Sequence, residues 1–234
     1  MAIILGTVWN GDFHKLTHFT KRSMSKTEAA CILFTHNMIG VAGECLCIPF
    51  APHVTTPNMS YRFQLYLDFL KANKSFENEM IMLTDIRDVA FLGDPFSVDY
   101  PDGLSVFLED PSKTIGTCSF NSAWIKEAYG PSGLEKLKDY PISCAGVTIG
   151  DYHAMVQYLT EMVATLSNFG LNDQGIHNGL IRFDKLKKVT IFENQLGPVL
   201  TMGYMSKPMV KNFDGSTPLV VHQFDRHPSL VGAF

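Results

Sequence analysis

The chain has 234 residues, of which 46% are hydrophobic and 18% charged, and its formal net charge is −4. The length allows a sizeable core, and the negative charge argues against a nucleic acid or an anionic membrane as partner. No run approaches the roughly 18 apolar residues of a membrane-spanning helix, and the first residues lack the basic start and cleavage site of a secretory signal. We therefore expect a cytoplasmic protein with no transmembrane segment.

The five cysteines are odd in number and scattered along the chain. Cys45 and Cys47 form a C-x-C pair, but no second pair follows at the spacing of a zinc site. The sequence therefore predicts buried, reduced thiols rather than a disulfide framework or a metal cluster.

Strand and helix signals alternate in the first half of the chain. In chain order they predict a strand over Ala2–Val8, a helix running into a strand over Met24–Thr35, mixed strand and loop over residues 43–58, a helix over Met59–Asn73, and strands over Glu79–Thr84 and Leu104–Glu109. The helix over Met59–Asn73 has the clearest pattern, because Phe63, Leu67 and Leu70 share one face, with Tyr66 alongside.

The second half continues the alternation. The predicted elements are a helix over Ser122–Tyr129 broken by GPSG, a strand over Cys144–Ile149, a helix over Tyr152–Phe169 ending at Gly170, a helix over Asp173–Phe183 capped by Asn172 or Asp173, and strands over Val189–Phe192, Val199–Met202 and Leu219–His222. Strands alternating with helices in this way predict an α/β fold with a mainly parallel central sheet flanked by helices.

One apolar run is interrupted by charge. Met80–Leu83 has the composition of a core strand, and Asp85, Arg87 and Asp88 follow it directly. Ligands of parallel sheets bind at the carboxyl ends of the strands, which favours a cleft position for these side chains. Two carboxylates there suit a hard divalent cation that also binds water and phosphate oxygens. The alternative is a polar turn in which Arg87 pairs with one of the acids.

A second polar group lies in LNDQGIHNGL, residues 171–180, where Asp173 and Gln174 are adjacent. Placed at the mouth of a cleft, a carboxylate and an amide bind sugar hydroxyls, and the carboxylate can act as a base. The alternative is that Asp173 caps a helix and the amides are surface residues.

A third polar group follows the apolar strand at the start of LVVHQFDRHP, residues 219–228. His222 comes directly after the apolar residues, as the acids do after Met80–Leu83. A single histidine after a strand is often structural, but His222 also suits a mixed Asp/His shell for manganese.

A fourth segment, SCAGVTIGD (residues 143–151), combines small residues with Gly146 and Gly150, which allow close approach of the backbone to a ligand. It lacks the spacing of a dinucleotide fingerprint, and no G-x-x-x-x-G-K-[ST] occurs in the chain. Phosphate binding by those two routes is therefore disfavoured.

Taken together, these segments resemble the GT-A family of glycosyltransferases. MLTDIRDVAFLGDPF is similar to the acidic DxD-type segment in its DxRDVxFxxDPF variant, CAGVTIGD resembles the NxGxxxG segment, NDQGIHNGL resembles the DQxxxN box, and VVHQFDRHPSL resembles the HQYDRHP ending. The four motifs occur in the family's order over residues 80–230, and with the ILGTVWN start the likeness covers most of the chain. Within the family, the chain most resembles the glycosyltransferases that large chlorella viruses encode for capsid glycans.

The resemblance implies one GT-A domain, Rossmann-like, over residues 1–234. Residues 1–100 would form the nucleotide-binding half, and residues 101–234 the half that binds the sugar and the acceptor. It also implies a nucleotide-sugar donor, namely a UDP-sugar, a glycan or glycoprotein acceptor, and Mn2+ or Mg2+ on the diphosphate. A viral enzyme of this kind would act in the host cytoplasm.

The resemblance also implies roles for individual residues. Asp85, Asp88 and His222 would hold the metal. Donor contacts would come from Gly6, Thr7 and Val8 at the end of the first strand. Further donor contacts would come from Arg62, on the helix that precedes the acidic strand, from Asp85 and from Gly146. For Arg62, the alternative is an ordinary solvated helix residue.

Asp173 and Gln174 would face the donor sugar. An inverting enzyme needs a base for the acceptor hydroxyl, which favours Asp173, with Asp151 in reserve. A retaining enzyme would instead place Gln174 near the anomeric carbon, and the sequence leaves this choice open. Arg87 stands where a strict D-x-D motif has an acid, and we expect it to point away from the metal.

Two other functions use the same residues. A metal-dependent phosphoesterase or nucleotidyltransferase would act on the phosphates without transferring sugar. A non-catalytic module would bind a sugar nucleotide or a glycan without turnover.

Overall fold

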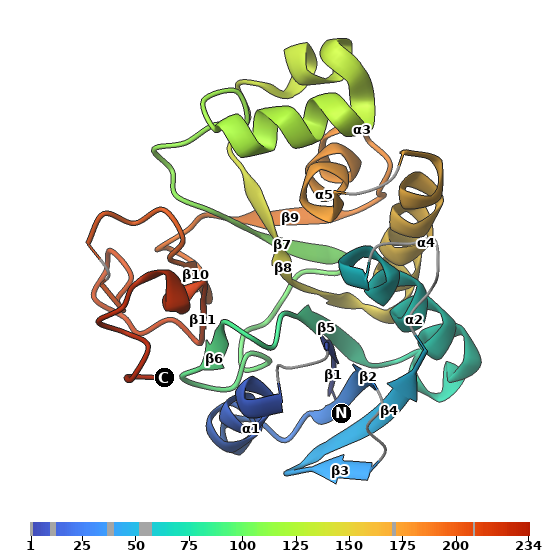
Figure 1. The fold of residues 1–234 in the computed structure, drawn as a ribbon, viewed down its shortest axis with the longest axis vertical. Helices are drawn as coiled ribbons and strands as arrows, with labels where there is room; N and C mark the ends of the chain where they lie inside the picture. The colour runs from blue at the N-terminus through green and yellow to red at the C-terminus, as the bar shows by residue number, and fades with distance from the viewer. Residues whose placement is uncertain (1, 10–12, 37–39, 52–57, 170–171, 208) are drawn as a thin grey trace.

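The fold is a layered α/β structure (Figure 1). The computed structural model describes residues 2–9, 13–36, 40–51, 58–169, 172–207 and 209–234. Eight strands form a large sheet in the order β3-β4-β2-β1-β5-β8-β7-β9, and three strands form a small sheet in the order β10-β11-β6.

The strands of the large sheet are β1 (Ala2–Val8), β2 (Ala30–His36), β3 (Gly40–Ala42), β4 (Cys45–Phe50), β5 (Met80–Thr84), β7 (Leu104–Leu108), β8 (Ser143–Asp151) and β9 (Val189–Phe192). The small sheet contains β6 (Val89–Phe91), β10 (Val199–Thr201) and β11 (Val220–His222). The α-helices are α1 (Phe13–Arg22), α2 (Asn58–Ala72), α3 (Ser119–Leu137), α4 (Tyr152–Phe169) and α5 (Asp173–Arg182).

The predicted α/β fold with a mainly parallel sheet is confirmed. Strands β4, β2, β1 and β5 are parallel neighbours, and β9 is parallel to β7. Strand β8 runs antiparallel between β5 and β7, which makes the sheet mixed. Because β8 is reversed, its first residues lie at the edge where β5 ends, with Thr84 opposite Val147. That edge carries the candidate site.

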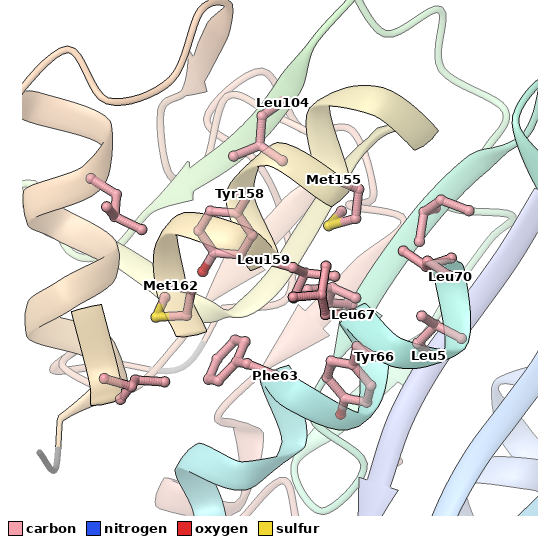
Figure 2. Close-up of a cluster of buried hydrophobic side chains, with 14 of the residues drawn as sticks. Leu5, Phe63, Tyr66, Leu67, Leu70, Leu104, Met155, Tyr158, Leu159 and Met162 are labelled. Atoms are coloured by element: carbon pink, nitrogen blue, oxygen red, sulfur yellow. The ribbon is translucent and has the colours of Figure 1, made fainter. Parts of the chain in front are cut away.

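Side chains alternate across β1, which places one hydrophobic cluster on each face of the sheet. Ile3 and Leu5 point to the face covered by α2 and α4, whereas Ile4 points to the face covered by α1 and the small sheet. Figure 2 shows the first cluster, in which Tyr66 and Leu70 of α2 are among the side chains that meet those of α4. The predicted apolar face of α2 is thus buried, as α/β packing requires.

The predicted elements differ from the structure in several places, and the short strands β3 and β6 were not predicted. Helix α1 was not predicted, although Leu16 and Phe19 bury its inner face. The segment predicted as a helix before the second strand contains a short 3-10 turn, Met24–Lys26. The chain does break after Tyr129, where Gly130 takes a left-handed φ of 72°, but helix resumes with Pro131 at its start.

The cysteines follow the expectation. All five are buried and free in the structure. Cys31 and Cys45 face each other across β2 and β4, and burial raises the pKa of the Cys31 thiol well above its ordinary value. The thiols therefore belong to the core.

Candidate metal centre

The small sheet brings Asp88 and His222 together. Strand β6 begins at Val89, directly after Asp88, and pairs antiparallel with β11 so that Val89 lies opposite His222. The backbone N–H of Gln223 then donates to the carbonyl of Asp88 at 2.8 Å. A short ladder therefore places the histidine beside an acid that is distant in sequence.

Asp85, Asp88 and His222 form one cluster. The Nε2 atom of His222 lies 3.5 Å from Oδ2 of Asp85 and 3.7 Å from Oδ1 of Asp88. One ligand atom from each residue lies within 4.8 Å of the other two, which is close enough for a single cation. The Asp88 and His222 side chains are almost fully buried, whereas that of Asp85 is 28% exposed, so solvent reaches the cluster from the Asp85 side.

The charged groups around this cluster shift the pKa values of Asp85 and His222. Burial raises the pKa of the Asp85 carboxyl, but Arg62 and His222 lower it by more, and the pKa lies well below its ordinary value. Burial lowers the pKa of the His222 imidazole, but Cys144 and the two carboxylates raise it by more, and that pKa lies well above its ordinary value. Without a cation, a proton on His222 therefore balances the carboxylates.

Gly146 lies against this cluster. Its carbonyl accepts a hydrogen bond from the backbone N–H of Asp85 at 2.8 Å. A Cβ atom at this position would meet Cε1 of His222, would lie 2.6 Å from Nε2 of the same ring and 2.8 Å from Oδ2 of Asp85. Any larger residue would thus overlap with the candidate ligand atoms unless the strand or the ring shifted.

Arg62 of α2 joins Asp85 to Asp173, the first residue of α5. Its Nη1 pairs with Oδ1 of Asp85, and its Nη2 donates to Oδ2 of Asp173 at 2.7 Å. The Arg62 side chain is 13% exposed, so it is not the solvated helix residue that the alternative described. The structure therefore brings the proposed nucleotide contact, metal ligand and base into one connected group.

Gln174 lies in the wall behind this group. Its Nε2 donates to Oε1 of Glu109 at 2.9 Å and to the carbonyl of Ser143 at 3.1 Å, and its Oε1 accepts from the backbone N–H of Ala145 at 2.9 Å. The Asn178 amide also binds the backbone of Ser143: its Oδ1 accepts a hydrogen bond from the N–H of Ser143, and its Nδ2 donates one to the carbonyl. These amides fasten α5 to the start of β8, and they are neither surface residues nor free toward a ligand.

His177, on α5, makes a second set of buried hydrogen bonds, which connect α4 to β8. Its Nε2 lies 2.9 Å from Ser143 Oγ, and its Nδ1 lies 2.9 Å from the hydroxyl of Tyr158. Ser143 donates to the carbonyl of Phe107, so it accepts from Nε2–H, and Tyr158 donates to Nδ1. Burial lowers the pKa of His177 to about 3, so this histidine is neutral at ordinary pH.

The end of β1 lies at the same edge of the sheet. The ladder between β1 and β5 runs from the pair Ala2–Met80 to the pair Leu5–Leu83, so Gly6, Thr7 and Val8 extend beyond it. Thr7 shares a 2.7 Å hydrogen bond with the hydroxyl of Tyr66, and an added Cβ at Gly6 would collide with Ile86.

Arg87 only partly follows the expectation that it points away from the cluster. Half of its side chain is exposed, yet Nη2 lies 3.1 Å from Oδ2 of Asp88, and Nε lies 3.5 Å from Oδ2 of Asp225. The expectation was incomplete because an arginine next to a buried carboxylate gains more from pairing with it than from solvent. This pairing leaves Oδ1 of Asp88 facing His222.

Two further acids were misjudged from sequence. Asp151 pairs with Met80 at the start of β5, and its side chain accepts hydrogen bonds from the N–H groups of Gly103 and Ala154. It therefore lies at the opposite edge of the sheet and is not part of this site. Glu109 was overlooked, although it directly follows β7, as Asp85 follows β5, and it is 4% exposed. The signal of an acid after a buried strand was therefore present.

The capping prediction for α5 is half right. Asn172 takes the N-cap position, but its side chain makes no capping hydrogen bond. Instead, Oδ1 of Asp173 accepts from the backbone N–H of Gln174 at 2.8 Å. Gly170, the expected end of α4, lies outside the described residues.

Comparison with protein-family models finds no match, and no curated protein matches the chain. Among the helices that the structure describes, none is both long and apolar enough to span a membrane. The argument for function therefore rests on the site itself.

Proposed function

We propose that the chain is a metal-dependent glycosyltransferase of the GT-A type, which transfers a sugar from a UDP-sugar to a glycan or glycoprotein acceptor. The observation that carries this proposal is the convergence of Asp85, Asp88 and His222 at the carboxyl edge of the sheet, with Arg62 and Asp173 alongside. The resemblance of the surrounding segments to GT-A motifs supports it. The same resemblance suggests viral capsid glycans as acceptors and the host cytoplasm as location.

The residues present fit a divalent cation. The Nε2 atom of His222 is buried and has no hydrogen-bond partner among the described residues. Two carboxylates and one imidazole form a donor set that suits Mn2+, and Mg2+ is the second choice. The absence of a side chain at Gly146 lets β8 approach these atoms closely, since an added Cβ would lie 2.6 Å from Nε2 of His222. A cation bound there supplies Lewis-acid stabilisation of the negative charge that grows on a departing nucleoside diphosphate.

The protein groups around the metal ligands would bind and orient the donor. Arg62 would add positive charge near the diphosphate, and Asp85, beside it, would contact both cation and nucleotide. The backbone of Gly6, Thr7 and Val8 extends past the ladder with β5 and would cradle uracil and ribose.

Asp173 would act as the base in an inverting reaction, where it takes the proton from the acceptor hydroxyl. Its Oδ2 accepts a hydrogen bond from Nη2 of Arg62 at 2.7 Å, which holds the carboxylate in place beside the cluster. Gln174 would contribute by fixing the start of α5 to β8, because its amide is already hydrogen-bonded to protein groups. Contact between Gln174 and the sugar, as a retaining mechanism would require, needs these bonds to rearrange.

Calorimetry with UDP tests the proposal. Asp88→Asn should strongly weaken Mn2+-dependent binding of UDP, because it replaces one of three ligands, a carboxylate, by a neutral amide, whereas Asp99→Asn on the exposed surface should bind as the wild type does. Unchanged affinity in Asp88→Asn would rule out the metal assignment. Chromatography of a UDP-sugar incubated with acceptor then separates the alternatives, since a phosphoesterase gives phosphate products and a binding module gives none.

A further inference from the structure

The ring nitrogen of His222 that faces away from the acids also has a neighbour. Its Nδ1 lies 3.4 Å from Sγ of Cys144, a thiol on β8 that is 3% exposed. Cys144 lies two residues before Gly146, so the same strand approaches the Nε2 side of the His222 ring at Gly146 and its Nδ1 side at Cys144.

The contact bears on which nitrogen of His222 carries the hydrogen. A neutral imidazole binds a cation through the nitrogen without hydrogen, and its other nitrogen then donates a hydrogen bond. If Nε2 faces the cation, Nδ1–H needs an acceptor. Among the described residues, the sulfur of Cys144 is its hydrogen-bond partner.

Glu109 extends this arrangement. Its Oε1 is held by Gln174 at 2.9 Å, whereas Oε2 is buried and has no hydrogen-bond partner among the described residues. Burial raises the pKa of this carboxyl group, and the nearby His222, Gln174 and Cys144 side chains lower it by less. When the sulfur accepts from His222, its own hydrogen is free to turn toward Glu109.

We infer that Cys144, backed by Glu109, is a positioning residue that orients His222 for a cation, by accepting a hydrogen bond from Nδ1–H and thereby leaving Nε2 free to coordinate. The inference rests on the metal site of the proposed function and goes beyond it by assigning a role to two residues outside the cluster. Cys144 does not touch the cation in this arrangement, because its sulfur lies on the far side of the ring.

Calorimetric titration with Mn2+ alone tests the inference. Cys144→Ala should weaken Mn2+ binding 10- to 100-fold, which is about the loss expected when the outer partner of a metal-binding histidine is removed. Cys144→Ser should keep most of the affinity, because a hydroxyl also accepts from Nδ1–H and donates onward. Cys47→Ala, which removes another thiol buried in a strand, should bind Mn2+ as the wild type does.

A Co2+ absorption spectrum gives a readout that a packing role would not change. Wild type and Cys144→Ser should show the same d–d bands, with no thiolate-to-cobalt charge-transfer band. Such a band in the wild type would make Cys144 a ligand and overturn the inference.

The remaining outcomes are distinct. Equal Mn2+ affinity in Cys144→Ala and wild type, or equal losses in Cys144→Ala and Cys144→Ser, would overturn the hydrogen-bond role while leaving the proposed function intact. A wild-type protein that binds no Mn2+ would overturn the metal site, and with it the proposed function.

Discussion

Asp85 and Asp173 share one cation, the guanidinium of Arg62. The two carboxylates come from the end of β5 and the start of α5, so this bridge connects the edge of the sheet to a helix on one of its faces. An arginine presents its donors in a rigid fork, which suits it to hold two carboxylates at a fixed separation. The bridge thus sets the distance between the proposed metal ligand and the proposed base.

Removal of this bridge should have two opposite effects. Arg62→Ala leaves two partly buried carboxylates without their partner and should lower the free energy of unfolding by about 3 kcal/mol in urea denaturation. The same change removes a positive charge near the cluster and should tighten Mn2+ binding about tenfold in calorimetry without nucleotide. Lys71→Ala, an exposed change on the same helix, should alter neither quantity; weaker Mn2+ binding in Arg62→Ala would contradict the arrangement.

Asp173→Asn should separate binding from chemistry. The amide keeps the shape of the side chain but cannot take a proton, so kcat for sugar transfer should fall roughly 10²- to 10⁴-fold while calorimetric affinity for the donor changes little. The exposed change Asp139→Asn is the matched control. Wild-type turnover in Asp173→Asn would remove this residue as the base.

Gly146→Ala should block the metal centre by size alone. The new methyl group would lie 2.6 Å from Nε2 of His222, so the ring or the strand must shift, and Mn2+ affinity should fall at least about tenfold. At Gly232 an added methyl group meets nothing within 4 Å, so Gly232→Ala serves as control. If both variants bind Mn2+ equally well, the close approach at Gly146 is not a feature of the folded protein.

His177 should make the fold sensitive to acid. Its pKa is about 3 in the folded protein and about 6.5 in the unfolded chain, so the unfolded chain binds a proton first. Its contribution to stability is therefore complete above about pH 6.5 and is lost as the pH falls toward 3. Between pH 7 and pH 5 the loss amounts to about 2 kcal/mol.

Urea denaturation at the two pH values measures this contribution. His177→Gln cannot take up the proton and should lose about 2 kcal/mol less than the wild type over that interval. Equal losses in the two proteins would show that His177 is not held neutral in the fold.

The sequence predicts the residues of this site only where it also predicts the strand that positions them. Asp85 was found because Met80–Leu83 is uniformly apolar and then stops at charge, and the carboxyl edge of a parallel sheet follows from the alternation of elements. Two strands of the small sheet, β10 and β11, were predicted, but β6 was not, and the pairing of the three strands was not foreseen because it is long-range. The position of His222 beside Asp88 depends on that pairing.

The role of Gln174 could not be predicted for a different reason. An amide in a loop-to-helix segment has the same sequence signature whether it faces a ligand or its own protein. What decides is the set of backbone groups nearby, and here the reversed strand β8 presents the carbonyl of Ser143 and the N–H of Ala145 to that amide. An antiparallel strand within an α/β sheet is not visible in the alternation of strands and helices.

The pairing of Val89 with His222 also has a consequence for how the protein is made. On the ribosome, Asp85 and Asp88 are synthesised well before β11, so the two acids initially lack the histidine. Contacts between segments this distant in sequence form slowly, because a long loop must close first. The candidate cation site is therefore complete only once β11 has been synthesised and has paired with β6.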